Sequence, residues 1–234
     1  MIAIYKREMR SYFTTPLGYV FLGAYLAIAG AVFSYTTLFA QSASVTPFFT
    51  FMLYASVVLL PLLTMKLFSE EKKQRTEQLL LTAPVSLTGI VSGKFLAAFT
   101  LFFGAHTLSS LYFLILYRYA DVKTAMLFGN YVAVLLAGMA FIAIGVFVSS
   151  MTENQLASAV GTIGVLLVFL LLSLLGALFS GYAVRYVFDC FSLFSRYVNF
   201  SNGIFDVAAL VYYLSVTVVF LFLTVRVFDK RRYS

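Results

Sequence analysis

Charged residues are scarce in this sequence of 234 residues. Only 11% of the residues are Asp, Glu, Lys or Arg and 62% are hydrophobic, whereas soluble domains average about 25% and about 45–50%. So few polar groups cannot cover so apolar an interior in water. The composition therefore excludes an ordinary soluble domain and indicates an integral membrane protein.

Long stretches carry no charge at all, namely residues 11–65, 95–117, 124–152, 154–184 and 207–225. A bilayer core of ~30 Å needs ~20 apolar residues in a helix, so the first run is long enough for two crossings. The runs are continuous in Leu, Phe, Val and Ala, which argues against the alternating strands of a barrel. We expect an all-α integral membrane protein with one transmembrane domain over 1–234 and six spans, near 17–40, 47–66, 94–117, 126–149, 156–180 and 206–227.

Cysteine and histidine each occur once. The single Cys190 excludes an intrachain disulfide, and we interpret it as a small packing residue. A metal centre built from several histidines cannot form, because His106, near the middle of the third span, is alone. We predict that His106 makes a hydrogen bond to a neighbouring helix, and we predict no metal site.

Groups that could load an ion or bind a nucleotide are also missing. No Asp, Glu, Lys or Arg lies in the middle of any predicted span, which weighs against an ion-driven carrier. The phosphate-cradling pattern G-x-x-x-x-G-K-[ST] does not occur, so the chain has no ATP site of that type. Energy for any work must then come from outside the membrane domain.

The charges that remain indicate the topology. Lys and Arg favour the cytoplasmic loops, and with six spans both termini share one side. Twelve of them fall on that side and four on the other, so we expect both termini in the cytoplasm, and the basic balance reflects topology and anionic lipid rather than nucleic acid. The twelve are Lys6, Arg7, Arg10, Lys66, Lys72, Lys73, Arg75, Lys94, Arg226, Lys230, Arg231 and Arg232; the four are Arg118, Lys123, Arg185 and Arg196.

The segment from Lys66 to Lys94 stands out because it carries 8 of the 25 charged residues between two apolar spans. Ser69 with Glu70 and Glu71 suits a helix N-terminus, and Ser86 can cap the helix of the third span. Between them lies a short stretch with Leu79 and Leu80, too short to cross a membrane. We predict that residues 67–93 form a cytoplasmic element that presents a docking knob to a soluble partner.

The N-terminus and the last loop are predicted to lie at the interface. Over residues 2–13, Ile2, Tyr5, Met9, Tyr12 and Phe13 share one face, Lys6, Arg7 and Arg10 share the other, and Ile4 is the exception. This pattern indicates an amphipathic surface helix that Thr15-Pro16 ends. The outer loop 181–205 is rich in aromatic residues, which favours a pair of short re-entrant or interfacial helices.

Small residues recur at a spacing of four in two spans. They are Gly23, Ala27 and Ala31 in the first and Ala157 and Gly161 in the fifth. Small residues let helices approach closely in lipid. The pattern predicts helix packing, and it leaves open whether the neighbouring helix belongs to the same chain or to a second copy.

One enzymatic alternative has a partial motif. Glu70, Glu71 and Arg75 fit E-E-x-x-x-R, and Phe102 to His106 fit F-x-x-x-H, patterns found in intramembrane metalloproteases. That chemistry needs several His around a metal. The absence of a second His and the surface position of the Glu pair, ~15 Å from mid-bilayer, argue against it.

The stretch from Met65 to Phe102 resembles the permease subunits of type-2 ATP-binding-cassette exporters. In that family acidic residues, a Thr, a further Glu, two Leu and a Pro follow the second span, and a Gly usually precedes the Thr. This sequence supplies Phe68, Glu70, Glu71, Thr76, Glu77, Leu79, Leu80 and Pro84, with Arg75 in place of the Gly. IYKREMRSYFTTPLGYVF, FVSSMTENQLAS and FSNGIFDVAALVYYLS are similar to the gliding-motility-type branch, although Asn202 stands where a basic residue is common.

The resemblance implies a mechanism. Residues 2–13 would be the elbow helix, and residues near 70–84, including Arg75, would be the coupling helix that enters a cleft on the ATPase. Two ATPase subunits would hold ATP and Mg, so this chain would bind no cofactor. A second permease copy or a related permease would complete the membrane domain in a bacterial inner membrane, and the branch suggests an extracytoplasmic auxiliary subunit. A membrane anchor for a cassette ATPase, without transport, is the alternative, and the substrate is left open.

Overall fold

The computed structural model describes residues 1–75, 86–119, 123–178, 192–201 and 206–232. Within these ranges the chain is helical and has no strand, and six helices are long and apolar enough to cross a membrane. This confirms the predicted fold class. The elements are α1 (Ile2–Thr14), α2 (Pro16–Phe33), η1 (Ser34–Phe39), α3 (Thr46–Thr64), α4 (Ser69–Lys73), α6 (Leu87–Ser110), α7 (Tyr112–Leu116), α8 (Thr124–Met151), α9 (Gln155–Leu178), α11 (Tyr197–Ser201) and α12 (Val207–Arg232).

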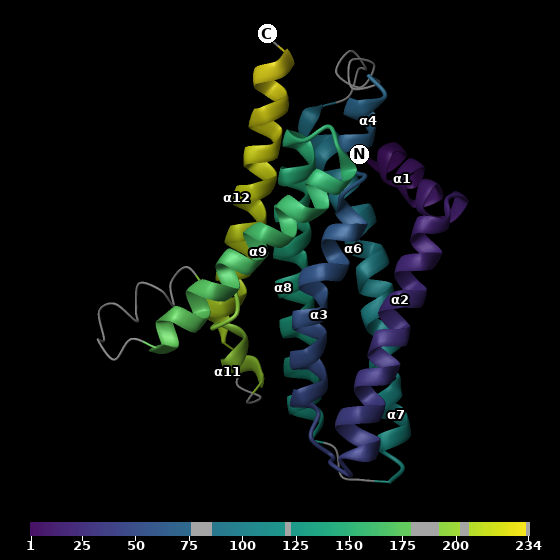
Figure 1. Ribbon diagram of the computed structural model, residues 1–234, viewed down its shortest axis with the longest axis vertical. Helices are drawn as coiled ribbons and strands as arrows, with labels where there is room; N and C mark the ends of the chain where they lie inside the picture. The colour runs from purple at the N-terminus through teal and green to yellow at the C-terminus, as the bar shows by residue number, and fades with distance from the viewer. Residues whose placement is uncertain (76–85, 120–122, 179–191, 202–205, 233–234) are drawn as a thin grey trace.

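Helices α3 and α8 form the centre of the bundle. In their most apolar windows 61% and 67% of the residues are buried, against 22–33% in the other four spans. Helices α2, α6, α9 and α12 surround this pair, and α9 diverges from the bundle toward its C-terminal end (Figure 1). Both termini lie at the same end of the bundle as α1 and α4 (Figure 1), in agreement with an even number of spans.

Two glycines of α8 allow the central helices to approach closely. A Cβ on Gly145 would lie 2.2 Å from Thr64 Oγ1 of α3, and one on Gly138 would lie 2.2 Å from Phe102 Cε1 of α6. No side chain fits in either place. Among the glycines in the described part of the chain, the closest neighbours on another helix are therefore those of α8, and not those of the small residues that sequence spacing singled out.

Helix α1 confirms the predicted N-terminal helix and its end. Thr15 is extended, with φ −95° and ψ 155°, and Pro16 is the first residue of α2. The packed face is the predicted one at Tyr5, Met9 and Tyr12, which pack against the core. It differs at the two ends, where Ile2 and Phe13 are 70% and 41% exposed, and at Ile4, the predicted exception, which lies 3.1 Å from the place of a Cβ on Gly93.

Some span boundaries differ from the predicted ones for local reasons. Helix α6 begins at Leu87 rather than at 94, because Ser86 caps it by accepting a hydrogen bond from the Gly89 backbone N–H at 3.2 Å. The first span ends in the π-helical turn η1, where Ser34 Oγ and Thr36 Oγ1 donate to the carbonyls of Gly30 and Val32. Helix α12 continues past 227 to Arg232.

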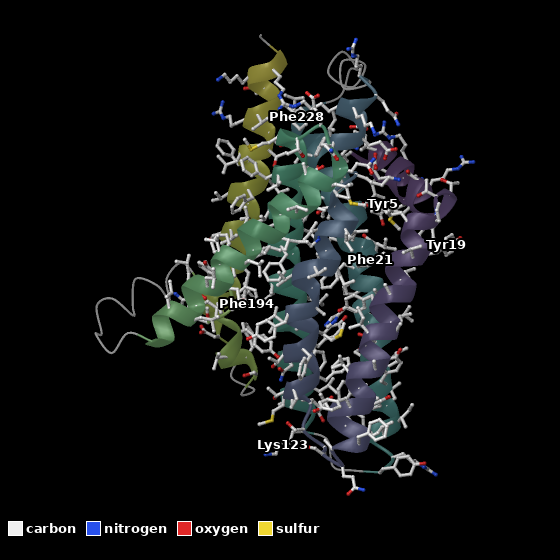
Figure 2. The ribbon with its side chains drawn as sticks, in the orientation of Figure 1. Tyr5, Tyr19, Phe21, Lys123, Phe194 and Phe228 are labelled. Carbon is white, nitrogen blue, oxygen red and sulfur yellow. The ribbon has the colours of Figure 1, made fainter. Side chains whose placement is uncertain are left out.

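Part of the outer loop packs into the bundle. Tyr197 in α11 donates to Asn130 Oδ1 of α8 at 2.6 Å, and the Ser201 carbonyl accepts from Asn130 Nδ2 and from Thr46 Oγ1 of α3. Phe194, labelled in Figure 2, is 5% exposed. One short helix of the predicted pair is therefore α11, while most of the remaining loop lies outside the described residues.

Candidate functional site

The chain after α3 is held to α8 at the end of the bundle where the termini lie. α3 ends at Thr64, and a turn leads to the short helix α4. Ser149 Oγ of α8 accepts hydrogen bonds from the backbone N–H groups of Phe68 and Ser69, at 3.1 and 3.2 Å, and donates to the Met65 carbonyl at 3.2 Å. One buried hydroxyl thus pairs the two N–H groups that the break in the helix would leave without a partner, and it shares the Met65 carbonyl with the Ser69 hydroxyl.

Four charged side chains meet beside this turn, and we call them the charge cluster: Arg7, Glu8, Glu71 and Lys94. Lys94 Nζ of α6 lies 3.0 Å from Glu8 Oε1 of α1 and 3.0 Å from Glu71 Oε1 of α4. Arg7 Nη2 lies 2.7 Å from each of the same two carboxylate oxygens. Two cations and two anions therefore join α1, α4 and α6.

Lys94 is the buried centre of the charge cluster. Its side chain is only 2% exposed; Nζ also donates to the Leu67 carbonyl at 2.6 Å and lies 5.0 Å from the centre of the Phe68 ring. A buried charge is tolerated only when it is paired and hydrogen-bonded, and these partners meet that requirement. Burial alone would raise the pKa of Glu8, but Lys94 and Arg7 outweigh burial and hold that pKa below its ordinary value.

The other charges of α4 extend the network toward the fourth and fifth spans. Glu70 pairs with Lys66 at 3.5 Å, and Lys72 pairs with Glu153, between α8 and α9, at 3.2 Å. These pairs are half-exposed to exposed, so each contributes little to stability. Their significance is geometric, because α4 then contacts the α8–α9 connection as well as α1 and α6.

The predicted coupling residues are only partly described. Thr76, Glu77, Leu79, Leu80 and Pro84 lie outside the described residues, whereas Glu70, Glu71 and Arg75 lie at the start of the segment. Arg75 has a backbone φ of +56°, a left-handed conformation that favours glycine. This is the position at which the exporters resembled by this sequence usually have Gly.

The remaining predicted residues lie at the surface of this chain. Lys6, Arg7 and Arg10 are exposed on α1, and Gly23, Ala27, Ala31 and Ala157 are exposed on α2 and α9. No other heavy atom comes within 4 Å of a Cβ on Gly23, whereas one on Gly161 would lie 3.2 Å from Val148 Cγ1. The predicted packing at these positions, apart from the Gly161 contact, therefore has no partner within the described chain.

His106 makes the predicted hydrogen bond between helices. Its Nδ1 lies 2.9 Å from Tyr25 Oη of α2, and its ring stacks on that of Tyr131 of α8 with the ring centres 4.9 Å apart. The described residues contain no group of three or more His, Cys, Asp or Glu that could hold a metal ion. The arrangement is that of a packed polar contact inside the bundle.

Sequence reasoning missed Glu8, Lys94 and Ser149 as site residues. Lys94 is the first residue of the predicted third span, where a charge needs a partner. Glu8 is the single acid among the basic residues of α1. Both signals were present in the sequence, while nothing distinguishes Ser149 from the many other serines of the spans.

One known family matches nearly the whole chain. The family model described as "ABC-2 family transporter protein" matches residues 3–232, from α1 to the end of α12. Among curated proteins the sequence has no match. Members of this family are membrane-spanning permeases that work with separate ATPase subunits and are not ATPases themselves. The chain therefore belongs to the ABC-2 family of transporter membrane proteins.

Proposed function

We propose that this chain is the permease subunit of an ATP-driven exporter, and that residues 70–84 receive the motion of a separate cassette ATPase. The observation that carries the proposal is the attachment of α4. This helix of five residues is fixed to α1 and α6 through the charge cluster, to α8 through Ser149, and to the α8–α9 connection through Lys72 and Glu153.

The contacts define how a displacement would travel. A push on the segment that follows Arg75 reaches α4 first. Glu71 then transmits it to Arg7 and Lys94, and Ser149 transmits it to the end of α8. An element that merely rested on the membrane surface would not need ionic contacts to α1 and α6, one of them to the buried Lys94, since burying a charge costs desolvation.

The proposal includes a topology and partners. The excess of Lys and Arg at the end with the termini supports a cytoplasmic position for α4, in a bacterial inner membrane. ATP and Mg would lie on two ATPase subunits, and a second permease copy would cover the exposed small residues of α2 and α9. The patterns at the N-terminus, at the end of α8 and before α12 support the gliding-motility-type branch, with an extracytoplasmic auxiliary subunit as a further partner.

The test is to delete residues 77–82 and measure the ATPase activity and co-purification of the cassette ATPase, with both proteins in lipid vesicles. We expect the deletion to abolish co-purification and stimulation while the chain still inserts in the membrane. A matched control deletes 41–44 in the connection at the opposite end of the bundle, and it should retain both. Undiminished stimulation in the 77–82 deletion would contradict the proposal.

The alternative of a membrane anchor makes a different prediction. Cysteine labelling of positions on α3 and α9 across the nucleotide cycle should change if the chain moves a substrate. Coupling to the ATPase with unchanged labelling would favour the anchor.

A further inference from the structure

A groove between α6 and α12 lies at the end of the bundle that carries the termini. Its volume is about 600 Å³. Its walls are apolar and come from Val91 of α6 and from Val218, Leu221, Phe222 and Val225 of α12. A volume of this size is in the range of small-ligand sites.

The groove has a polar mouth with one charge of each sign. Arg226 and Asp229 line it, with Nη1 and Oδ2 3.6 Å apart, and the Arg226 guanidinium lies 5.0 Å from the centre of the Phe222 ring. Ser86, Thr88 and Ser92 line the α6 side. The Arg226 and Asp229 side chains are 65% and 41% exposed, so both can accept a further partner.

The orientation of the groove relative to the membrane follows from α12. Val218 and Arg226 are eight residues apart, which is ~12 Å along a helix. The apolar wall therefore runs from the hydrocarbon region toward the end of the span, and the charged pair lies at the level of lipid headgroups. A ligand that fits must have an apolar chain and a charged head.

We propose that this groove binds a phospholipid whose head carries both a phosphate and a primary ammonium, as in phosphatidylethanolamine. The phosphate would take hydrogen bonds from Arg226, whose guanidinium suits bidentate pairing with oxyanions. The ammonium would donate to Asp229, and an acyl chain would lie along Val218, Leu221 and Phe222.

Charge complementarity selects this head over others. Arg226 and Asp229 sum to zero, so an anionic head such as phosphatidylglycerol would face the Asp229 carboxylate without a cation to pair with it. The trimethylammonium of phosphatidylcholine has no N–H to donate. Of these three heads, only that of phosphatidylethanolamine satisfies both side chains.

The chain contains no Trp, so the fluorescence of a single introduced Trp can report on the groove. A Phe222→Trp variant places one indole in the groove and keeps an aromatic ring under Arg226. A matched Leu223→Trp variant places the indole one residue further along α12, at a position that does not line the groove. Each is placed in phosphatidylcholine vesicles containing a tenth of brominated phosphatidylethanolamine, phosphatidylglycerol or phosphatidylcholine, and quenching is measured.

In the Phe222→Trp variant we expect quenching to show that phosphatidylethanolamine is enriched at least about threefold in the groove relative to phosphatidylglycerol and phosphatidylcholine. An enrichment of this size corresponds to the free energy of an exposed ion pair. The Leu223→Trp reporter should detect no preference. Adding Asp229→Asn to the Phe222→Trp variant should remove the preference, and Arg226→Gln should weaken retention of all three lipids. Lys230→Gln, which removes a charge from the same end of α12, should change nothing. Glycerophosphoethanolamine, which lacks acyl chains, should not compete.

Equal quenching by the three lipids at both reporters would overturn the proposal. A preference for phosphatidylglycerol would overturn the role of Asp229 and indicate a site for anionic lipid. Competition by the chain-free head would show a soluble phosphate ligand instead of a membrane lipid. A preference that survives Asp229→Asn would also contradict the pairing.

Discussion

Lys94 holds a positive charge where almost no water reaches it. Its charge is balanced by Glu8 and Glu71, each 3.0 Å from Nζ, and each carboxylate is shared with Arg7. Removing the lysine would leave two carboxylates, which are only 13% and 17% exposed, with one cation between them. The penalty would come from the unpaired partners more than from the lost contact.

Lys94→Met should therefore lower the free energy of unfolding by about 3 kcal/mol, measured by denaturant titration in detergent micelles. Lys66→Met is the control, because its half-exposed pair with Glu70 should be worth less than about 1 kcal/mol. Combining Lys94→Met with Glu71→Gln should recover part of the loss. Equal effects of the two lysine substitutions would show that the charge cluster does not hold these helices together.

Arg75 adopts a backbone conformation that a side chain disfavours. Its φ of +56° costs a non-glycine residue about 1 kcal/mol, and glycine has no such penalty. Arg75→Gly should raise the free energy of unfolding by up to about 1 kcal/mol, partly offset by the greater freedom of glycine in the unfolded chain. Arg75→Ala, which keeps the Cβ, should give no gain in the same titration. If alanine stabilises as much as glycine, the gain comes from loss of the guanidinium instead.

At the scale of elements, the fit of α8 against α3 allows almost no change. A Cβ on Gly145 would collide with Thr64, which is fully buried and whose hydroxyl donates to the Pro61 carbonyl. Gly145→Ala should lower the free energy of unfolding by about 1–3 kcal/mol, as overpacked cores do. Gly164→Ala on α9 is the control: nothing lies within 4 Å of its Cβ, so it should be neutral or stabilising by up to about 1 kcal/mol. A neutral Gly145→Ala would indicate that the two helices separate easily.

The helices could be predicted from the sequence because continuous apolar runs are a strong signal. The six spans, the helix before Thr15 and the cap at Ser86 all follow from local residues. The partners of α1 could not be predicted in the same way, because Glu8 contacts Lys94 and Ile4 lies against Gly93, both far away in sequence. Similarly, the spacing rule found the small residues of α2 but not Gly145, whose importance depends on which helix lies opposite.

Part of the candidate site could also be predicted from local residues. Glu70 and Glu71 indicate a polar element because they interrupt an apolar sequence. Their different partners, Lys66 for one and Arg7 with Lys94 for the other, depend on how α1 and α6 pack around α4.

For the whole molecule, the distribution of charge predicts which end faces the cytoplasm. Gln74 directly follows α4. Gln41 lies in the connection before α3, at the opposite end of the bundle: Ala43 and Ser44 of that connection line a cavity together with Lys123, which Figure 2 labels at that end. In a Cys190→Ser background, Gln41→Cys should react with a membrane-impermeant maleimide in intact spheroplasts. Gln74→Cys should react only in inverted vesicles. The reverse pattern would place α4 outside the cell, where no ATPase could contact it.

The bonds of Ser149 change what the break after α3 can do. An interrupted helix ordinarily behaves as a hinge: it bends, so that a rotation of the segment on one side is not transmitted to the other. Here the Ser149 hydroxyl connects the end of α3, the start of α4 and α8 through hydrogen bonds at one point. The three helices would therefore rotate together. At the opposite ends of α3 and α8, Thr46 and Asn130 donate hydrogen bonds to the Ser201 carbonyl of α11. A displacement of α4 would therefore also move α11.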